Sequence, residues 1–224
     1  HYFGDGFARA FEIEYTDKNN NPVTPFETSW GTSTRLIGAI IMTHGDDNGL
    51  VLPPAIAPIQ AVVIPIAAHK EGVLDKANEV YGRLKKICRA KIDTSEQTPG
   101  WKFAEYEMKG VPLRIELGPK DIENNSCIVV RRDNGEKISV SLDELEAKIP
   151  ELLNAVRDGL YNKALERRAN MTFTAHTLDE MKDIADNKPG FIKAMWCGAR
   201  ECEDKLKEYA GVTSRCIPFE QEEI

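Results

Sequence analysis

A buried strand followed by an amphipathic helix is the feature that most constrains the fold of this 224-residue chain. Residues 61–64 (AVVI) are continuously apolar, which is typical of a strand covered on both faces. After them, apolar residues recur at helical spacing, at Leu74, Ala77, Val80, Leu84 and Ile87. A strand and a helix in this order form a βα unit, so the middle of the chain is predicted to contain a sheet with packed helices.

Three further strands are predicted in the same region, at residues 111–117 (VPLRIEL), 127–130 (CIVV) and 137–140 (KISV). Ser141 and Glu144 have the spacing of a helix capping box, and Pro150 suits the first turn of a helix. An apolar stripe continues that helix through residues 152–164. The economical architecture is a mixed sheet with helices packed on it.

The first 59 residues have a different pattern. Residues 10–15 alternate in polarity and precede a turn at residues 17–22, which indicates a hairpin. Residues 36–42 (LIGAIIM) fit a buried helix or a buried strand, and periodicity alone does not decide between them. Three prolines at positions 53, 54 and 58 interrupt regular structure and predict a boundary between domains.

The last part of the chain is predicted to contain helices at residues 178–185 and 203–209 and strands at 191–196 and 216–219. We therefore expect domains at residues 1–59, 60–157 and 158–224. The chain opens on His1 rather than on methionine, and its last five residues bring no closing element. Both ends are typical of a fragment of a longer protein.

Composition excludes several classes of protein. With 29 basic and 36 acidic residues, a net charge of -7 and 42% hydrophobic residues, the chain is predicted to be soluble and globular. No apolar run approaches the roughly 20 residues of a membrane-spanning helix. Five cysteines are an odd number and too sparse for a disulfide framework. They suit a reducing compartment, which favours a cytoplasmic location. The net negative charge argues against a protein that binds nucleic acid over its whole surface, but it does not exclude a local basic face.

The densest signal for a ligand site is the polar run TSWGTSTR at residues 28–35. Its glycine permits close backbone approach, its hydroxyl groups offer hydrogen bonds, and Arg35 is suited to phosphate oxygens. No Walker lysine or GxGxxG motif accompanies it. From these residues alone, an ordinary polar turn is the preferred interpretation and a ligand site is the alternative.

Longer runs carry a resemblance to a known family. The run TSWGTSTRLIGAIIMTHGDDNGLVLPPAIAPIQ resembles motif 3 and the following linker of prolyl-tRNA synthetases, in the class II form of archaea, eukaryotes and some bacteria. TPGWKFAEYEMKGVPLRIELGPKDIE is similar to their anticodon-binding domain, and CGARECED with RCIPFE resembles their C-terminal zinc-associated domain. The resemblance covers nearly all of the chain. It implies the end of an antiparallel catalytic sheet, then an α/β anticodon-binding domain with a mixed sheet, then an incomplete small α+β domain.

The family activates L-proline with ATP to prolyl-adenylate and transfers it to tRNA(Pro). The resemblance therefore implies L-proline, tRNA(Pro) and ATP with Mg²⁺ as ligands, a homodimer for the intact protein, and no membrane. Class II motifs 1 and 2 are not found in these residues, so this chain alone is expected to be inactive. The alternatives are a non-catalytic RNA-binding module with the anticodon-binding fold and a regulatory relative that senses proline.

Carried over by position, the resemblance implies that Arg35 is the catalytic motif 3 arginine facing ATP, with Ser33 a second ATP contact. His1, Trp30 and Gly31 would form the proline pocket. Ordinary core packing is the alternative for Trp30, and a disordered terminal residue is the alternative for His1.

In the second domain, the resemblance implies that Glu107, Arg114, Lys120 and Lys137 contact the anticodon. Glutamate can accept from the amino groups of guanine or cytosine, and the cations can donate to guanine or to phosphates. For Arg114, a charge pair with Glu116 on a solvated face is the alternative. Lys120 stands where many relatives have arginine, which keeps the charge but loses the bidentate fork.

Cys197 and Cys202 are half of a zinc site, because tetrahedral zinc requires four ligands. The resemblance implies that zinc is possible only if a second cysteine pair follows beyond Ile224. Cys216 lies in a predicted apolar strand and is expected to be a buried thiol. Cys88 and Cys127 are predicted to be core residues.

Overall fold

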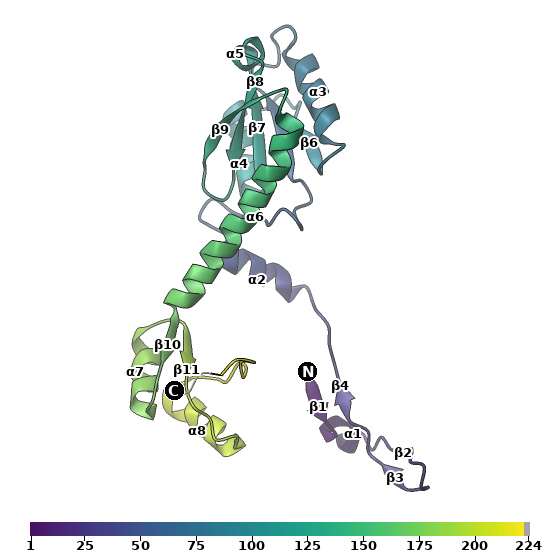
Figure 1. The fold of residues 1–224 in the computed structure, drawn as a ribbon, viewed down its shortest axis with the longest axis vertical. Helices are drawn as coiled ribbons and strands as arrows, with labels where there is room; N and C mark the ends of the chain where they lie inside the picture. Colours follow the sequence, from purple (N-terminus) through teal and green to yellow (C-terminus); the bar gives the residue numbers. More distant parts are fainter. Residues whose placement is uncertain (222–224) are drawn as a thin grey trace. The chain divides into compact units, whose positions relative to one another are not determined.

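The structure is a computed structural model of the chain, and it describes residues 1–221 (Figure 1). Two compact units divide the chain between Thr43 and His44. The division precedes the boundary expected near residue 59, because the segment that follows His44 folds against the second unit.

The first unit consists of short elements. Strand β1 (Tyr2–Gly4) pairs antiparallel with β4 (Glu27–Thr28), and β2 (Tyr15–Thr16) and β3 (Pro22–Val23) form the predicted hairpin. Helix α1 (Gly6–Ala10) occupies the start of the alternating run that predicted a strand, so that prediction holds only at its end. Helix α2 (Arg35–His44) resolves the ambiguity of LIGAIIM.

The expected burial of LIGAIIM is wrong for this structure. Within residues 1–43, only Ala8 is fully buried, and Leu36, Ile37 and Met42 are all more than half exposed. The reason is that strands of two or three residues provide no sheet face broad enough to cover a helix.

The second unit is built on a five-stranded mixed sheet in the order β6-β5-β7-β8-β9. The strands are β5 (Ala61–Pro65), β6 (Ala90–Ile92), β7 (Leu113–Leu117), β8 (Ser126–Arg131) and β9 (Lys137–Ser141). β5 pairs in parallel with β6 and β7, whereas β7–β8 and β8–β9 are antiparallel. The predicted mixed sheet is confirmed, and β6 is an edge strand that the sequence pattern missed.

The two faces of this sheet differ in what covers them. The first face packs against α3 (Val73–Leu84) and α6 (Leu145–Asn170), whose side chains join the main core. The second face packs against α4 (Pro99–Met108), with Val62, Ile64 and Tyr106 in a smaller core. Alternation along β7 puts Leu113 and Ile115 in the main core and Arg114 on the second face.

Helix α6 begins after the predicted cap at Ser141 and before the position predicted from Pro150. It starts at Leu145, so Pro150 lies inside the helix rather than in its first turn, and Ser141 ends β9 instead of capping the helix. The domain boundary expected between residues 157 and 158 falls inside this continuous helix. No helix in residues 1–221 is both long enough and apolar enough to cross a membrane.

Beyond α6, β10 (Thr172–Thr174) and β11 (Phe191–Lys193) form a parallel pair, with α7 (Leu178–Asn187) and α8 (Arg200–Ala210) around a small core. The predicted strand at residues 216–219 is wrong, because these residues pair with no other described strand. The expectation of a buried Cys216 fails for the same reason, since that thiol is exposed. Short α5 (Pro119–Glu123) follows β7.

The cysteine predictions in the sheet unit are confirmed. Cys127 is fully buried in the main core, and Cys88 packs against the same core. Burial raises the pKa of the Cys127 thiol to about 12. Such a thiol is inert at neutral pH.

An ion pair between α3 and α6 is expected to contribute to the stability of the protein in acid. Arg83 on α3 donates two hydrogen bonds to the Glu146 carboxylate on α6, which lowers the pKa of Glu146 to about 2. A carboxyl with a lowered pKa in the folded state adds stability above about pH 4.5, and that stability is lost as pH falls toward 2. We expect Arg83→Met to make the free energy of unfolding less dependent on pH between 5 and 2, measured by urea titration.

Arg157→Met is the matched control, since its partner Asp158 is adjacent in sequence and both side chains are largely exposed. An exposed pair of this kind contributes little to stability. If Arg83→Met and Arg157→Met have the same pH profile as the unmodified chain, the Arg83–Glu146 pair does not contribute to acid stability.

Candidate nucleic-acid interface

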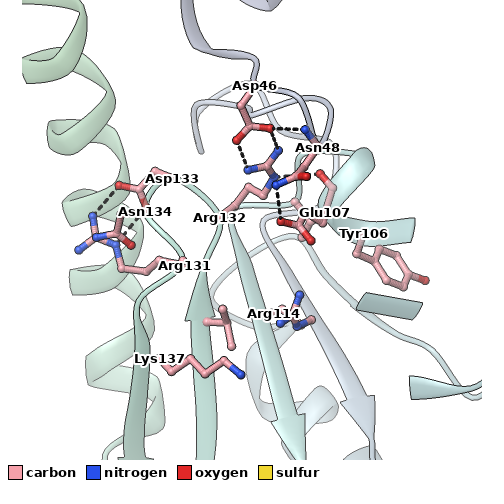
Figure 2. A pocket seen from close by; sticks show the side chains of 13 residues that line it. Asp46, Asn48, Tyr106, Glu107, Arg114, Arg131, Arg132, Asp133, Asn134 and Lys137 are labelled. Atoms are coloured by element: carbon pink, nitrogen blue, oxygen red, sulfur yellow. Dashed lines mark hydrogen bonds and ion pairs between the residues drawn. The ribbon is translucent and has the colours of Figure 1, made fainter. Parts of the chain in front are cut away.

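A cavity of about 450 Å³ opens on the second unit where α4 ends beside the sheet (Figure 2). Its lining combines the ends of β7, β8 and β9, the last turn of α4 and a turn at residues 46–49. The charged and amide side chains among its lining residues are those of Asp46, Asn48, Glu107, Arg114, Arg131, Arg132, Asp133, Asn134 and Lys137. Three of the four residues expected to contact the anticodon are in this set.

Strand register explains why Arg114 and Lys137 lie together. Arg114 pairs with Val130 across β7 and β8, and Val130 pairs with Lys137 across β8 and β9. The three residues form one row across three strands, on the sheet face opposite the main core. Neighbouring strands are about 4.8 Å apart, so the row places the two cations on one strip of open sheet.

Arg114 is held by two contacts. Its Nε donates to Glu116 Oε1 at 3.0 Å, two residues along the same strand, so the charge pair considered from the sequence is present. The two side chains are only 16% and 15% exposed, so the pair does not lie on a solvated face. Its guanidinium carbon lies 4.1 Å from the centre of the Phe103 ring on α4. A guanidinium plane stacked on one side by an aromatic ring is a surface on which a nucleobase can stack. The charge pair and an RNA contact are therefore compatible.

Glu107 lies in the last turn of α4 and is half-buried. Its carboxylate oxygen Oε1 accepts a hydrogen bond from Asn48 Nδ2 at 3.3 Å. Its backbone carbonyl accepts from Arg132 Nε at 2.9 Å. These contacts fix both the backbone and the carboxylate of Glu107 at the rim of the cavity (Figure 2).

Arg132 forms a bidentate ion pair with Asp46, with nitrogen–oxygen distances of 2.7 and 2.6 Å. The hydrogen bond from Arg132 is the largest favourable influence on the Asp46 carboxylate and holds its pKa below the usual range. The Arg132 side chain is only 6% exposed. This arginine therefore fastens the turn at residues 46–49 to the sheet rather than presenting a free cation.

Arg131 has a similar structural role on the opposite face of the sheet. It donates to Asp133 Oδ2 at 2.7 Å and to the carbonyl of Ala155 on α6 at 3.1 Å. These bonds hold the turn that joins β8 to β9, and Lys137 follows that turn. Sequence analysis missed both arginines, although RRDNG at residues 131–135 is a recognisable turn signal.

Lys120 is not brought together with the other three residues. It is exposed on α5, which follows the carboxyl end of β7, while Arg114 lies near the amino end of that strand. It is not among the residues that line the cavity. Its contact with the anticodon stays a prediction.

The site residues expected in the first unit are all exposed. Trp30 is 91% exposed, so the alternative of core packing does not apply in this structure. Ser33 Oγ accepts from the backbone N–H of Arg35 at 3.4 Å, at the start of α2. The terminal ammonium of His1 donates to the carbonyl of Ser29 at 2.6 Å, and its ring is stacked on Phe3. Gly31 has open space around its Cα.

Cys197 and Cys202 lie close together at the beginning of α8. A hydrogen bond from the backbone N–H of Ala199 is the largest cause of the lowered pKa of Cys197, and its bond with Cys202 lowers that pKa further. Two adjacent thiols fit half of a tetrahedral zinc site. In residues 1–221, no cluster of three or more metal-ligating side chains completes it.

Two family models match parts of the second unit. Residues 60–152 match the model described as "Anticodon binding domain", and residues 178–224 match "Prolyl-tRNA synthetase, C-terminal". The chain is 64% identical over 224 residues to a protein named Proline--tRNA ligase from Clostridium novyi and 61% identical to one from Ruminiclostridium cellulolyticum. Each match covers 100% of this chain and 47% of the relative.

Among solved structures, the chain is similar to prolyl-tRNA synthetase from Cryptosporidium parvum complexed with L-proline and AMP. The TM-score is 0.88 and the sequence identity is 43%, over 99% of this chain and 49% of that chain. The chain thus spans about half the length of the curated relatives it matches.

Proposed function

We propose that this chain, which belongs to the prolyl-tRNA synthetase family, recognises the anticodon of tRNA(Pro) with the cavity and open sheet face of its second unit. One observation carries the proposal. A glutamate fixed at the cavity rim and a row of two cations, Arg114 and Lys137, lie on one surface formed by α4 and the sheet.

The chemistry of the three side chains suits unpaired bases. Single-stranded RNA is read by stacking and by hydrogen bonds to the edges of its unstacked bases. The Glu107 carboxylate offers acceptors to the N–H groups of guanine or to the amino group of cytosine. Lys137 offers donors to guanine O6 or N7 and to phosphates. Arg114, packed on Phe103, offers guanidinium N–H donors to a base edge or a phosphate.

We also propose that the first unit contributes to activation of L-proline and its transfer to tRNA(Pro). Attack of the proline carboxylate on the α-phosphate of ATP forms prolyl-adenylate and releases pyrophosphate. Arg35 would stabilise the negative charge that develops on the phosphate, with Ser33 a second contact to ATP. His1, Trp30 and Gly31 would contact proline. The similar structure from Cryptosporidium parvum is a complex with L-proline and AMP, which supports proline and an adenine nucleotide as ligands.

Other ligands and partners follow from the same proposal. ATP in this reaction carries Mg²⁺, but the described residues contain no cluster of three metal-ligating side chains, and no step above depends on the metal. Zinc would be held by Cys197 and Cys202 together with two further ligands. A homodimer and a cytoplasmic location are proposed for the protein on grounds of family.

Substitution of Glu107 tests the anticodon proposal. The measurement is the dissociation constant of the 224-residue chain for two RNA stem-loops, one with the natural anticodon of tRNA(Pro) and one with its guanines replaced. We expect Glu107→Ala to narrow the ratio of the two constants by a factor of about 5 to 150, because one base-edge contact contributes about 1–3 kcal/mol of discrimination. Lys137→Ala should weaken both complexes and reduce the salt slope by about one.

Lys120→Ala completes the series, because it shows whether the recognition surface extends to α5. Narrowing of the ratio would support its assignment. If Glu107→Ala leaves the ratio unchanged, the anticodon is not read by Glu107. Discrimination with no aminoacylation by a longer protein that contains this chain together with class II motifs 1 and 2 would instead favour the non-catalytic RNA-binding alternative.

A further inference from the structure

We infer that Asn48 is a positioning residue for Glu107, and that its amide sets how strongly the cavity favours a base with paired N–H donors, such as guanine. The inference rests on the proposed function, since it concerns how the same cavity reads a base. Neither residue lies near the other in sequence, and the contact is made only by the fold.

The contact itself has one allowed orientation. Asn48 Nδ2 lies 3.3 Å from Glu107 Oε1, and both residues line the cavity. An ionised carboxylate can only accept hydrogen bonds, so the asparagine must present its NH₂ group. This uses one acceptor position of the carboxylate and leaves the others for a ligand. The amide therefore restrains the glutamate without blocking it.

Asn48 is held in place by the turn that carries it. Its backbone N–H donates to Asp46 Oδ1 at 3.0 Å, and Asp46 is in turn fixed by the bidentate pair with Arg132. On the other side, Gly49 approaches Met108 so closely that a Cβ at this position would lie 2.6 Å from the Met108 carbonyl oxygen. The turn has little freedom to move relative to the end of α4.

The hydrogen bond from Asn48 to Glu107 is expected to increase the affinity for a base rather than the stability of the fold. Asn48 is exposed, so loss of its side chain is expected to change the free energy of unfolding little. A glutamate side chain with free rotamers must be ordered when a base binds, and that ordering costs affinity. Holding the carboxylate in advance reduces this cost for the base that uses it. A base that makes no bond to Glu107 gains nothing from the arrangement.

Asn48→Asp is the direct test, because it keeps the shape of the side chain and replaces the donor by a carboxylate facing Glu107. We expect it to reduce the ratio of dissociation constants for the guanine-replaced and natural stem-loops at least about fivefold. Asn48→Ala removes the donor without adding charge, so it should reduce the same ratio of dissociation constants, but by a smaller factor. It keeps the test valid if Asn48→Asp fails to fold.

Asn134→Asp is the matched control. Asn134 lines the same cavity, but its side chain is hydrogen-bonded to Glu136 in the turn that joins β8 to β9. The substitution adds the same charge, so it should weaken both stem-loops alike and leave the ratio unchanged. If Asn48→Asp behaves as Asn134→Asp does while Glu107→Ala narrows the ratio, the positioning role is overturned and the proposed function stands.

The double variant Glu107→Ala with Asn48→Asp separates positioning from direct reading. Once Glu107 is absent, the second change should not narrow the ratio further. A further narrowing would show that Asn48 contacts the base itself, which would overturn the inference. If Glu107→Ala alone has no effect on the ratio, it is the proposed function that fails.

Discussion

Replacement of Gly110 by alanine is expected to lower the free energy of unfolding of the second unit by about 2–5 kcal/mol. Gly110 ends the turn after α4 with φ of +70°, a left-handed conformation that alanine adopts only at a cost. A Cβ there would lie 2.7 Å from the backbone carbon of Leu50. The Gly110 carbonyl also accepts from Leu52 N at 3.3 Å, so separation of the two segments breaks that bond.

The measurement is urea unfolding followed by circular dichroism. Gly82→Ala is the matched control, because Gly82 lies in α3, has no positive φ, and has no neighbouring atom within 4 Å of the position that an added methyl group would occupy. In a helix interior, alanine is more favourable than glycine by roughly 0.5–1 kcal/mol, so this control should gain stability. Equal stability of the two variants would show that the close approach of residues 50 and 110 does not constrain the fold.

The 224-residue chain by itself is expected to exchange pyrophosphate into ATP, dependent on proline, at least about 10⁵-fold more slowly than a full-length relative such as the Clostridium novyi protein. Trp30 is 91% exposed, and Arg35 and Ser33 are exposed on the same unit. Orientation of reacting groups contributes about 7–11 kcal/mol to reactions of this kind, and exposed side chains in water do not provide it. Charge stabilisation by Arg35 is also weak at high dielectric constant.

Exchange of radiolabelled pyrophosphate is the assay, with binding of the anticodon stem-loop by the same preparation as the control for folding. Binding without exchange is the expected result. A rate within tenfold of the full-length relative would show that the first unit already holds its catalytic groups in position. The expectation that Trp30, Ser33 and Arg35 are too exposed to act in catalysis would then be incorrect.

Local patterns in the sequence determined most of the second unit. The continuous apolar run became β5, the helical stripe became α3, and the alternation of Leu113, Arg114 and Ile115 put every second residue of β7 into the core. These predictions succeeded because burial on one or both faces imposes a period that is visible within one segment. The edge strand β6 was missed because three residues are too few for such a period.

The resemblance to a family supplied Glu107, Arg114, Lys120 and Lys137, but only the tertiary structure showed which of them share a surface. Two strand registers put Arg114 and Lys137 in one row, whereas Lys120 lies on α5. Strand register depends on how separate strands pair, and no single segment of sequence encodes it.

The contacts that shape the cavity were decided by tertiary structure alone. Arg132 meets Asp46 across 86 positions of sequence, and Asn48 meets Glu107 across 59. In the sequence, Asp46 and Asn48 belong to one ordinary polar turn and Arg132 to another, because nothing local distinguishes a turn held against a helix from one in solvent. Periodicity reports burial within a segment, but a side chain's partner is fixed by chain segments brought together from a distance. For that reason the sequence determined the sheet and its core, and only the folded chain decided how Glu107 is held at the rim of the cavity.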